Sequence, residues 1–554
     1  MNERQPLRQW AIGVALCLTL THSPLGTSQA YADSVPLQQA YADSVPLQQA
    51  LAEQLSKMDA HHLPIAEFYQ LRDGQLAWQR TGAVESLVAA LNSLETDGLT
   101  PDDYHADTLL DEFQRSQAAS EAAQATFDIK ATRSLLLALE HLERGKVNPR
   151  EVEPQWDAPR PERGYSLLRV VHAVDDSDIE NAIALARPSS PEYQQLRDAL
   201  KQHYQLMNLG SVPFLAPRDE SLRLGDEDDD VSVLRQRLAL WGEADIQVAD
   251  SRAYPMIGVQ TSSNRRVFDA PLEAAVRRFQ RRHLLQEDGV VGEQTRLALN
   301  TSVASRIDQL RVNLERARWI RPMQFAEPRV WVDIAGYRMH YLRPNGQHWD
   351  ARVVVGRPRR ETPIIHSTIS HLTINPTWTI PPTIMREDVL PKVRADIDYL
   401  ARKNIQVISP MGEPLVADEI DWQHPGGVML RQVAGASNPL GRVVVRFPNN
   451  DMIYLHDTPA RGLFQRDQRA LSSGCIRVEG VAELAQLLLQ DSGSRYRMNS
   501  LLNGGSDLNV NLTLRIPIAL HYLTAWPNAE GEVEFRPDIY RRDAALLAAL
   551  RRPV

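Results

Sequence analysis

Two residues in the C-terminal third of the chain have the types and surroundings of a nucleophile and its base. His456 lies in the run Tyr-Leu-His-Asp-Thr, at the end of an apolar, strand-like segment, and Cys475 follows in Ser-Ser-Gly-Cys-Ile-Arg-Val. A cysteine nucleophile needs a base for its proton, a turn that exposes its sulfur and donors for an oxyanion. Gly474 permits an unusual turn, and the backbone N–H groups around Gly474 and Cys475 are candidates for those donors. The pattern indicates a cysteine nucleophile with a histidine base.

Two other features bear on this chemistry. Arg477 lies two residues beyond the cysteine, and a guanidinium can bind a substrate carboxylate through two hydrogen bonds. The alternative for Arg477 is a structural ion pair. The remaining histidines, which include His366, His371 and His424, are interpreted as structural or surface residues, and they show no metal-ligand spacing. We therefore predict no metal and no cofactor.

The N-terminus predicts export. A basic segment precedes an apolar run from Trp10 to Leu20, and small residues follow it. This is the pattern of a secretory signal peptide, and the run is shorter than the roughly 20 residues that span a bilayer. We expect cleavage within residues 1–32, a periplasmic protein and no stable membrane insertion. Loss of Cys17 would leave Cys475 as the only thiol in an oxidising compartment, where a lone thiol is expected to be buried or used.

Length and composition set the frame for these residues. The chain has 554 residues, of which 43% are hydrophobic and 24% charged, with a formal net charge of −9. It is too long for one core and too apolar to be disordered, so two to four domains are expected. The acidic balance argues against nucleic acid as a partner, because phosphate contact requires an excess of Lys and Arg.

The periodicity divides the chain into regions of different character. Residues 51–217 follow helical spacing, with stop signals at Gly98 and Gly145. From residue 328 onwards, β-branched and turn-rich segments predict strands, and residues 381–430 break that rhythm as an insertion able to cover a cleft. Residues 31–40 and 41–50 are identical, and we interpret the duplication as a linker without assigned function.

Residues 222–301 contain four short motifs in a fixed order. They are a Leu-Arg-x-Arg-Leu helix, Phe-Gln, Asp-Gly-x-x-Gly and Thr-x-x-Ala-Leu. Together they resemble the small three-helix peptidoglycan-binding domain, and Gly289 and Gly292 are expected to permit a positive-φ turn between two helices. The acidic run Asp226–Asp230 is expected to begin a helix, with calcium binding as the less favoured alternative.

The cysteine and histidine motifs resemble the active-site signature of the L,D-transpeptidases. The common signature has a second His where this chain has Ser473, a substitution that the large members tolerate. Further matches are Asn-Pro-Thr-Trp-Thr-Ile-Pro from Asn375 and Asn-Pro-Leu-Gly from Asn438. The resemblance covers about residues 60–545 and is closest to the large multi-domain members of Gram-negative bacteria, the YcbB type with a YkuD-type catalytic domain.

The resemblance implies a reaction and a role for each site residue. Cys475 would attack the amide between meso-diaminopimelate and the terminal D-Ala of a tetrapeptide stem, releasing D-Ala, and a second diaminopimelate amine would resolve the thioester into a 3→3 cross-link. His456 would be the general base, Asp457 would orient it through a backbone carbonyl, and Gly474 would belong to the oxyanion hole. Residues expected to line the substrate groove are Arg477, Tyr454, Trp378 and Ser473. Carbapenems would acylate the same cysteine.

The implied fold is multi-domain α+β. We expect a signal peptide at residues 1–32, a duplicated linker at 33–50 and a helical scaffold at 51–217. The peptidoglycan-binding domain is expected at 222–301 and a mostly-β catalytic domain with its lid insertion at 328–500. A C-terminal segment at 501–554 is expected to pack on the scaffold and catalytic domains. Expected partners are peptidoglycan stem peptides and glycan, peptidoglycan synthases and D,D-carboxypeptidases, in cell wall biogenesis and cell shape.

Three alternatives remain open on sequence alone. The first is an exported Cys-His endopeptidase that passes the acyl group to water, although such enzymes usually place Cys before His. The second is a catalytically idle peptidoglycan-binding scaffold, against which the intact pair of His456 and Cys475 argues. The third is attachment of an outer-membrane lipoprotein to peptidoglycan, a related reaction that the motif does not exclude.

Overall fold

The computed structural model describes residues 46–57, 63–153, 156, 163–208, 212–243, 265–320, 328–505 and 507–554. The predicted signal peptide, Cys17 and most of the duplicated segment lie outside these residues. Residues 46–50, at the end of the duplication, are helical, and Leu47 and Ala50 pack against the core of the helical region. Among the described helices, none has both the length and the apolarity to cross a membrane.

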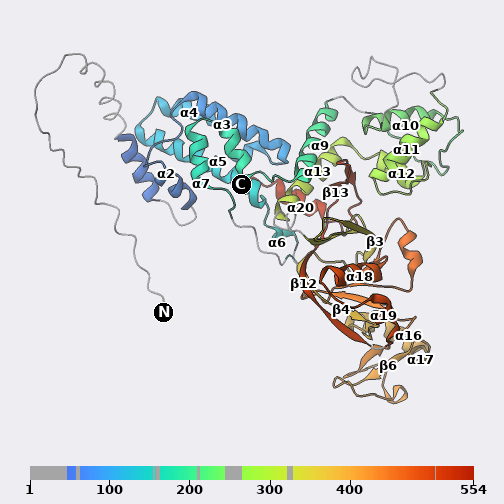
Figure 1. The fold of residues 1–554 in the computed structure, drawn as a ribbon. Coiled ribbons are helices and arrows are strands. Elements are labelled where there is room, and N and C mark those ends of the chain that lie inside the picture. Colours follow the sequence, from blue (N-terminus) through green and yellow to red (C-terminus); the bar gives the residue numbers. More distant parts are fainter. Residues whose placement is uncertain are drawn as a thin grey trace, which may run out of the picture.

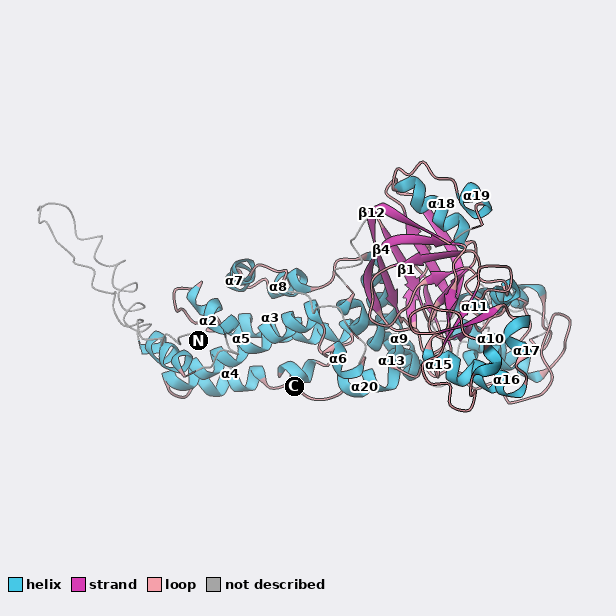
Figure 2. Cartoon of the chain, turned by 90° about the horizontal axis from the view of Figure 1, so that it is seen from below, coloured by secondary structure: helices cyan, strands magenta, loops and turns pink. Residues whose placement is uncertain are grey.

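The N-terminal region is an elongated helical body (Figures 1 and 2). Its central helix ends at Gly145, as the sequence predicts, and a left-handed Gly98 ends another helical segment. Leu87 and Leu91 are fully buried on the inner face of their helix. The elements are α2 (Leu63–Gln70), α3 (Thr81–Ser93), η2 (Leu94–Asp97), η3 (Pro101–Tyr104), α4 (Leu109–Gln117), α5 (Glu121–Arg144), α6 (Pro149–Val152), α7 (Leu167–Asp175) and α8 (Ile179–Ala186).

The predicted peptidoglycan-binding region is a separate three-helix unit. It consists of α10 (Asp229–Leu240), α11 (Ala270–Arg282) and α12 (Glu293–Leu299), which bury their own apolar core. The acidic run begins a helix as expected, with the Asp228 carboxylate accepting a hydrogen bond from the Asp230 N–H. Gly289 has the expected positive φ of 74°, whereas Gly292 has φ −80° and precedes α12 in extended backbone. The prediction for Gly292 was wrong because only the first glycine reverses the chain.

Two helices join the three regions. α9 (Pro191–Met207) and α13 (Val303–Trp319) pack together against a short hairpin of β13 (Ala525–Pro527) and β14 (Val533–Phe535). α13 is buried along most of its length, and its polar side chains bond to both neighbours. Asn313 pairs with Thr524 of the C-terminal segment, while Arg318 reaches the backbone carbonyl of Asp97 in the helical body. Figure 1 shows these helices at the meeting point of the domains.

The catalytic region is built on a sheet that closes on itself. Its strands run in the order β10-β3-β11-β9-β8-β4-β12-β1-β2, and β2 also pairs with β3. Branched side chains from the inner faces fill the centre. The strands are β1 (Arg329–Asp333), β2 (Arg338–Leu342), β3 (His348–Gly356), β4 (Ile365–Ile374), β8 (Val443–Arg446), β9 (Leu455–His456), β10 (Ala470–Ser472), β11 (Ile476–Val478) and β12 (Leu508–His521), with η6 (Arg461–Gln465) between β9 and β10.

The C-terminal segment does more than pack on its neighbours. β12 lies inside the sheet, antiparallel to β4 and parallel to β1. α18 (Val481–Asp491) packs against β8 and β12, and it is followed by α19 (Met498–Asn503). α20 (Asp543–Leu550) returns to α13. The catalytic sheet is therefore incomplete without residues beyond 500.

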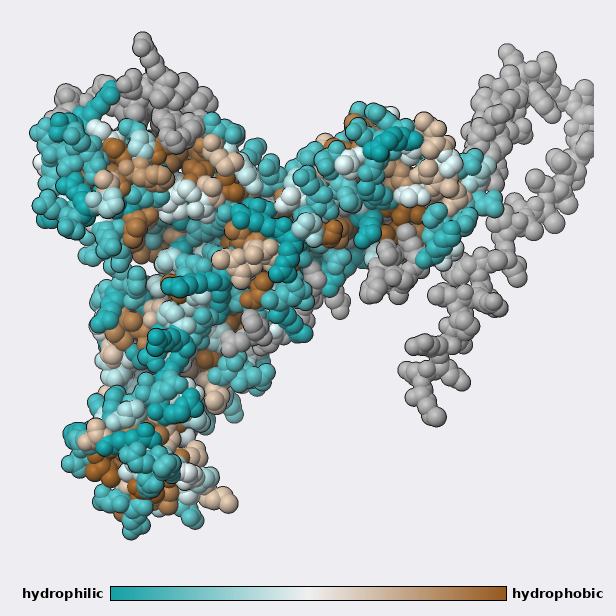
Figure 3. All heavy atoms as spheres, turned by 180° about the vertical axis from the view of Figure 1, so that it is seen from behind, coloured by the Kyte–Doolittle hydropathy of each residue, from teal (hydrophilic) through white to brown (hydrophobic). Residues whose placement is uncertain are grey.

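The inserted lid has a small core of its own. A three-stranded sheet of β5 (Trp378–Thr379), β7 (Met429–Gln432) and β6 (Ile405–Ile408) packs against short helices around Leu390, Leu400 and Trp422. The helices are α15 (Pro382–Ile384), the π-helical turn η4 (Met385–Val389), α16 (Leu390–Ala395), α17 (Asp398–Arg402) and the 3₁₀ turn η5 (Ala417–Glu419). Figure 3 shows apolar and hydrophilic side chains interspersed over this end of the molecule.

Arg318 provides a test of the junction between the domains. Its guanidinium is 1% exposed and bonds to the fully buried Glu315 at 2.5 Å. Replacing one partner of a buried pair leaves the other charge uncompensated, so Arg318→Met is expected to lower the free energy of unfolding by about 3–5 kcal/mol. Urea unfolding followed by circular dichroism measures the change.

Arg402→Met is the matched control for that measurement. Arg402 is 57% exposed and pairs with Asp396 on the lid surface, so its loss is expected to cost less than about 1 kcal/mol. Equal unfolding midpoints for the two variants would contradict the role assigned to Arg318.

Candidate active site

Parallel pairing of two short strands brings the sequence-predicted residues together. β9 and β11 align so that Arg477 lies opposite His456. Side chains two residues apart in a strand point to the same face, so Tyr454 and His456 share a face with Cys475 and Arg477. All four line one cleft.

The histidine is held in a single orientation. His456 is 4% exposed, and its Nδ1 lies 2.5 Å from the carbonyl oxygen of Asp457. A carbonyl can only accept, so Nδ1 carries the proton and Nε2 is left as the basic nitrogen. Asp457 is fixed in turn, because its N–H donates to Val443 and its side chain fills the space beside Gly441, where a Cβ would lie 2.5 Å away. This is the arrangement expected for Asp457.

The turn before the cysteine depends on glycine. Gly474 has φ +115°, which residues with a side chain rarely adopt. The Ser472 hydroxyl donates to the Cys475 carbonyl at 2.6 Å and accepts from the Gly474 N–H at 3.1 Å. The Gly474 N–H is therefore already engaged, which corrects its expected part as an oxyanion donor. The Cys475 N–H makes no hydrogen bond within the described part of the chain.

Cys475 and His456 are both neutral in this structure. Burial raises the pKa of the Cys475 thiol above its ordinary value. Burial, helped by the charges of Arg477 and Arg446, lowers the pKa of His456 to about 3. The thiol contacts the Met452 carbonyl oxygen, 3.7 Å from Sγ. The thiol proton has therefore not been transferred to His456 in this state.

The four residues expected to bind substrate all line the cleft, whose volume is about 1380 Å³. Tyr454 lies close enough to Cys475 and Trp378 for both side chains to affect the pKa of its hydroxyl, so it lies between the strand that carries His456 and the start of the lid. Arg477 has a buried Nε without a hydrogen-bond partner among the described residues. Ser473 accepts a hydrogen bond from Arg360 at 2.9 Å, so its hydroxyl connects to the protein as well as facing the cleft.

Several cleft residues were missed by sequence reasoning. Arg446 lies on β8 with its guanidinium 4.6 Å from the centre of the Tyr454 ring. His371, which was interpreted as structural or surface, lines the cleft. His366 fits that interpretation, since it packs between Trp156 and His521. A basic residue inside an apolar strand, as in Val-Val-Val-Arg, was the available signal for Arg446.

Arg360 ties the lid to the nucleophile turn. Its guanidinium lies 2.5 Å from Glu387 and 2.5 Å from Asp388, both on the π-helical turn of the lid, and it also donates to Ser473. Arg357 adds a longer contact to Asp388 at 3.6 Å. A change in lid position therefore changes the contacts of the residue two places before Cys475.

The comparisons with known proteins agree with this geometry. Residues 327–497 match the family described as "L,D-transpeptidase catalytic domain", residues 227–299 match "Putative peptidoglycan binding domain", and residues 64–200 match "Scaffold domain". The chain contains an L,D-transpeptidase catalytic domain. A Haemophilus influenzae protein named "Putative L,D-transpeptidase" is 37% identical over 248 residues. The matched part is 44% of this chain and spans about half the length of that relative.

The protonation state of the transpeptidase domain predicts a pH profile. A thiol with a raised pKa is protonated at neutral pH, so alkylation of Cys475 by iodoacetamide is expected to keep accelerating into the alkaline range. Mass spectrometry of the time course gives the rate at each pH. A rate that is already constant near neutral pH would indicate a preformed thiolate and contradict the neutral pair.

The lid contacts of the transpeptidase domain are also testable. Arg360→Gln removes two short ion pairs, each worth up to about 1 kcal/mol when partly exposed, so the lid is expected to open about tenfold more often. Brief digestion with chymotrypsin, followed by mapping of cuts in residues 381–430, measures this opening. Arg402→Gln removes an ion pair within the lid and is the control. Equal cutting of both variants would contradict the coupling.

Proposed function

We propose that this protein is a peptidoglycan L,D-transpeptidase that forms 3→3 cross-links between meso-diaminopimelate residues of tetrapeptide stems. The observation that carries the proposal is the presence of Cys475 and an oriented, neutral His456 imidazole in one cleft that also holds Arg446 and Arg477. Arg446 and Arg477 form no ion pair among the described residues. Stem peptides carry several carboxylates, and guanidinium groups that form no ion pair are suited to bind them.

The proposed reaction has two acyl-transfer steps. The sulfur of Cys475 attacks the carbonyl carbon between diaminopimelate and D-Ala while His456 Nε2 takes the thiol proton. His456 then gives that proton to the leaving amine, so D-Ala departs and a thioester remains. The side-chain amine of a second diaminopimelate attacks the thioester, its proton passes to His456, and the thiol is restored. No cofactor is needed for this sequence.

The cleft environment favours attack only when substrate is bound. A base with a pKa of about 3 does not ionise the thiol by itself. Burial is the main reason for the low pKa of the His456 imidazole, and substrate carboxylates near Arg446 and Arg477 would offset the smaller part that comes from those positive charges. Filling the cleft would also exclude water, which favours an amine over water as the acceptor.

The other domains fit a protein that works on the cell wall. The small three-helix domain would hold glycan or peptide near the catalytic cleft, and the predicted signal peptide would place the protein in the periplasm. Peptidoglycan synthases and D,D-carboxypeptidases are proposed partners, since the latter make tetrapeptide stems. A carbapenem would acylate Cys475 as a mimic of the donor peptide.

The decisive assay uses purified disaccharide-tetrapeptide as both donor and acceptor. The mature protein is expected to give a cross-linked dimer with loss of one D-Ala, as measured by chromatography and mass spectrometry. Cys475→Ala is expected to give none, and His456→Gln to lower the rate at least 100-fold. Release of D-Ala or cut stems without dimer would favour a hydrolase, and inactivity of folded protein would favour a binding scaffold.

A further inference from the structure

The carbonyl of Gly474 is held from behind the active site. The Thr362 side chain is fully buried, and its hydroxyl donates to the Gly474 carbonyl oxygen at 2.7 Å. The same hydroxyl accepts from the Gly356 N–H at 2.9 Å, which leaves its proton for Gly474. Thr362 is the residue after Glu361 on the loop between β3 and β4, far from the cysteine in sequence but behind its turn in space.

This hydrogen bond fixes the direction of the next N–H. In a trans peptide the C=O and the N–H point to opposite sides. Since the Gly474 carbonyl points to buried Thr362, the Cys475 N–H points away from it, on the side of the cleft that Cys475 lines. That N–H is the donor in the turn that Ser472 leaves unused. Its direction is what an oxyanion hole requires.

A glycine cannot hold this peptide by itself. Gly474 tolerates positive and negative φ about equally, and a Cβ at this position would have ordinary to tight contacts only, the nearest being Ile453 at 3.3 Å. The Ser472 hydroxyl holds the Gly474 N–H and the Cys475 carbonyl on either side of this peptide, but it does not bond the Gly474 carbonyl, which needs another partner. Thr362 is that partner.

Thr362 is itself clamped by the C-terminal segment. The Tyr540 hydroxyl donates to the Gly356 carbonyl at 2.7 Å and accepts from the Thr362 N–H at 3.1 Å. Tyr540 stacks on Tyr522, with ring centres 5.2 Å apart, and its N–H donates to the Tyr522 hydroxyl. The Tyr540 hydroxyl therefore holds the Thr362 N–H and the Gly356 carbonyl in place.

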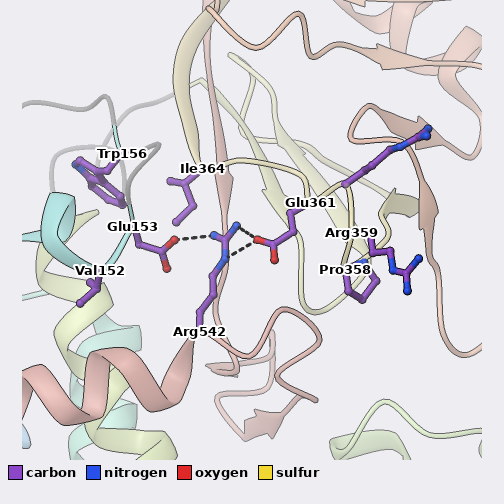
Figure 4. Close-up of a pocket in the computed structure, with 9 residues that line it drawn as sticks. Val152, Glu153, Trp156, Pro358, Arg359, Glu361, Ile364 and Arg542 are labelled. Atoms are coloured by element: carbon purple, nitrogen blue, oxygen red, sulfur yellow. Dashed lines mark hydrogen bonds and ion pairs between the residues drawn. The ribbon is translucent and has the colours of Figure 1, made fainter. Parts of the chain in front are cut away.

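The clamp continues to the helical body. Arg542, two residues after Tyr540, pairs with Glu361 at 2.5 Å and with Glu153 at 2.8 Å. Figure 4 shows the Arg542 guanidinium between the two carboxylates, in a cavity of about 600 Å³. Glu153 follows directly after α6, so the loop that carries Thr362 is anchored to the helical body through one arginine.

We propose that Thr362, clamped by Tyr540, is a positioning residue that turns the Cys475 N–H into the cleft as an oxyanion donor. The inference rests on the proposed function, because it assigns a donor for that same acyl transfer. Thr362 does not touch the substrate. It acts through the peptide bond that precedes the nucleophile.

The test compares two reactions of the same sulfur. Acylation of Cys475 by a carbapenem passes through an oxyanion, whereas alkylation by iodoacetamide is a displacement that forms none. Thr362→Val keeps the shape and removes the donor, and it is expected to slow acylation about 10- to 100-fold while alkylation stays within about threefold. Thr362→Ser keeps the hydroxyl and is expected to restore most of the acylation rate. Tyr540→Phe is expected to slow acylation by a smaller factor, again without matching loss of alkylation.

The outcomes separate this inference from the function on which it rests. Equal loss of both rates in Thr362→Val, or an unchanged ratio of the two rates, would overturn the positioning role. Failure of Thr362→Ser to recover acylation would do the same. If the unsubstituted protein reacts with iodoacetamide but not with any carbapenem or tetrapeptide, the transpeptidase function itself is overturned, and the positioning role falls with it.

Discussion

The parallel pairing of β9 with β11 is the constraint on which the chemistry depends. Parallel neighbours cannot be joined by a tight turn, because the chain must leave the first strand and return to the same end. Here it passes through η6 and β10, which pairs with β3 on the other side of β11. The sequence separation between His456 and Cys475 is the length of this connection. The lid, the arginines and the clamp behind the turn all act on groups that this pairing has already set side by side.

The electrostatics around Cys475 and His456 follow from burial and from the two neighbouring guanidiniums of Arg446 and Arg477. Cys475 and His456 are kept neutral by burial, while two nearby guanidiniums remain cationic. Such a site is suited to an anionic peptide, whose carboxylates supply the counter-charges that the two guanidiniums lack. Arg360 is a third cation of the cleft, and its charge is offset by ion pairs with the lid carboxylates Glu387 and Asp388.

The sequence predicted what is encoded locally. A strand that ends in histidine, and a glycine before a cysteine, are features of adjacent residues, so Cys475, His456 and Asp457 could be named in advance as residues that lie together at one site. Helix ends at Gly98 and Gly145 are local in the same sense. Thr362 and Arg360 could not be found this way, because their partners Gly474 and Ser473 lie 112 and 113 residues away. The Gly474 N–H was misassigned because a motif does not show that the Ser472 hydroxyl occupies it.

The position of β12 has a consequence for how the active site comes into being. The matched catalytic region ends at residue 497, yet the sheet needs β12, and the turn at Gly474 is clamped through Tyr540. Synthesis runs from the N-terminus, so Cys475 is made before β12 and Tyr540, which pack behind its turn. A truncated chain that ends after residue 497 would contain every residue of the recognised signature but would lack the strand and the tyrosine that hold the turn in place. The turn at Gly474 can therefore take its final conformation only after residues up to Tyr540 have been synthesised.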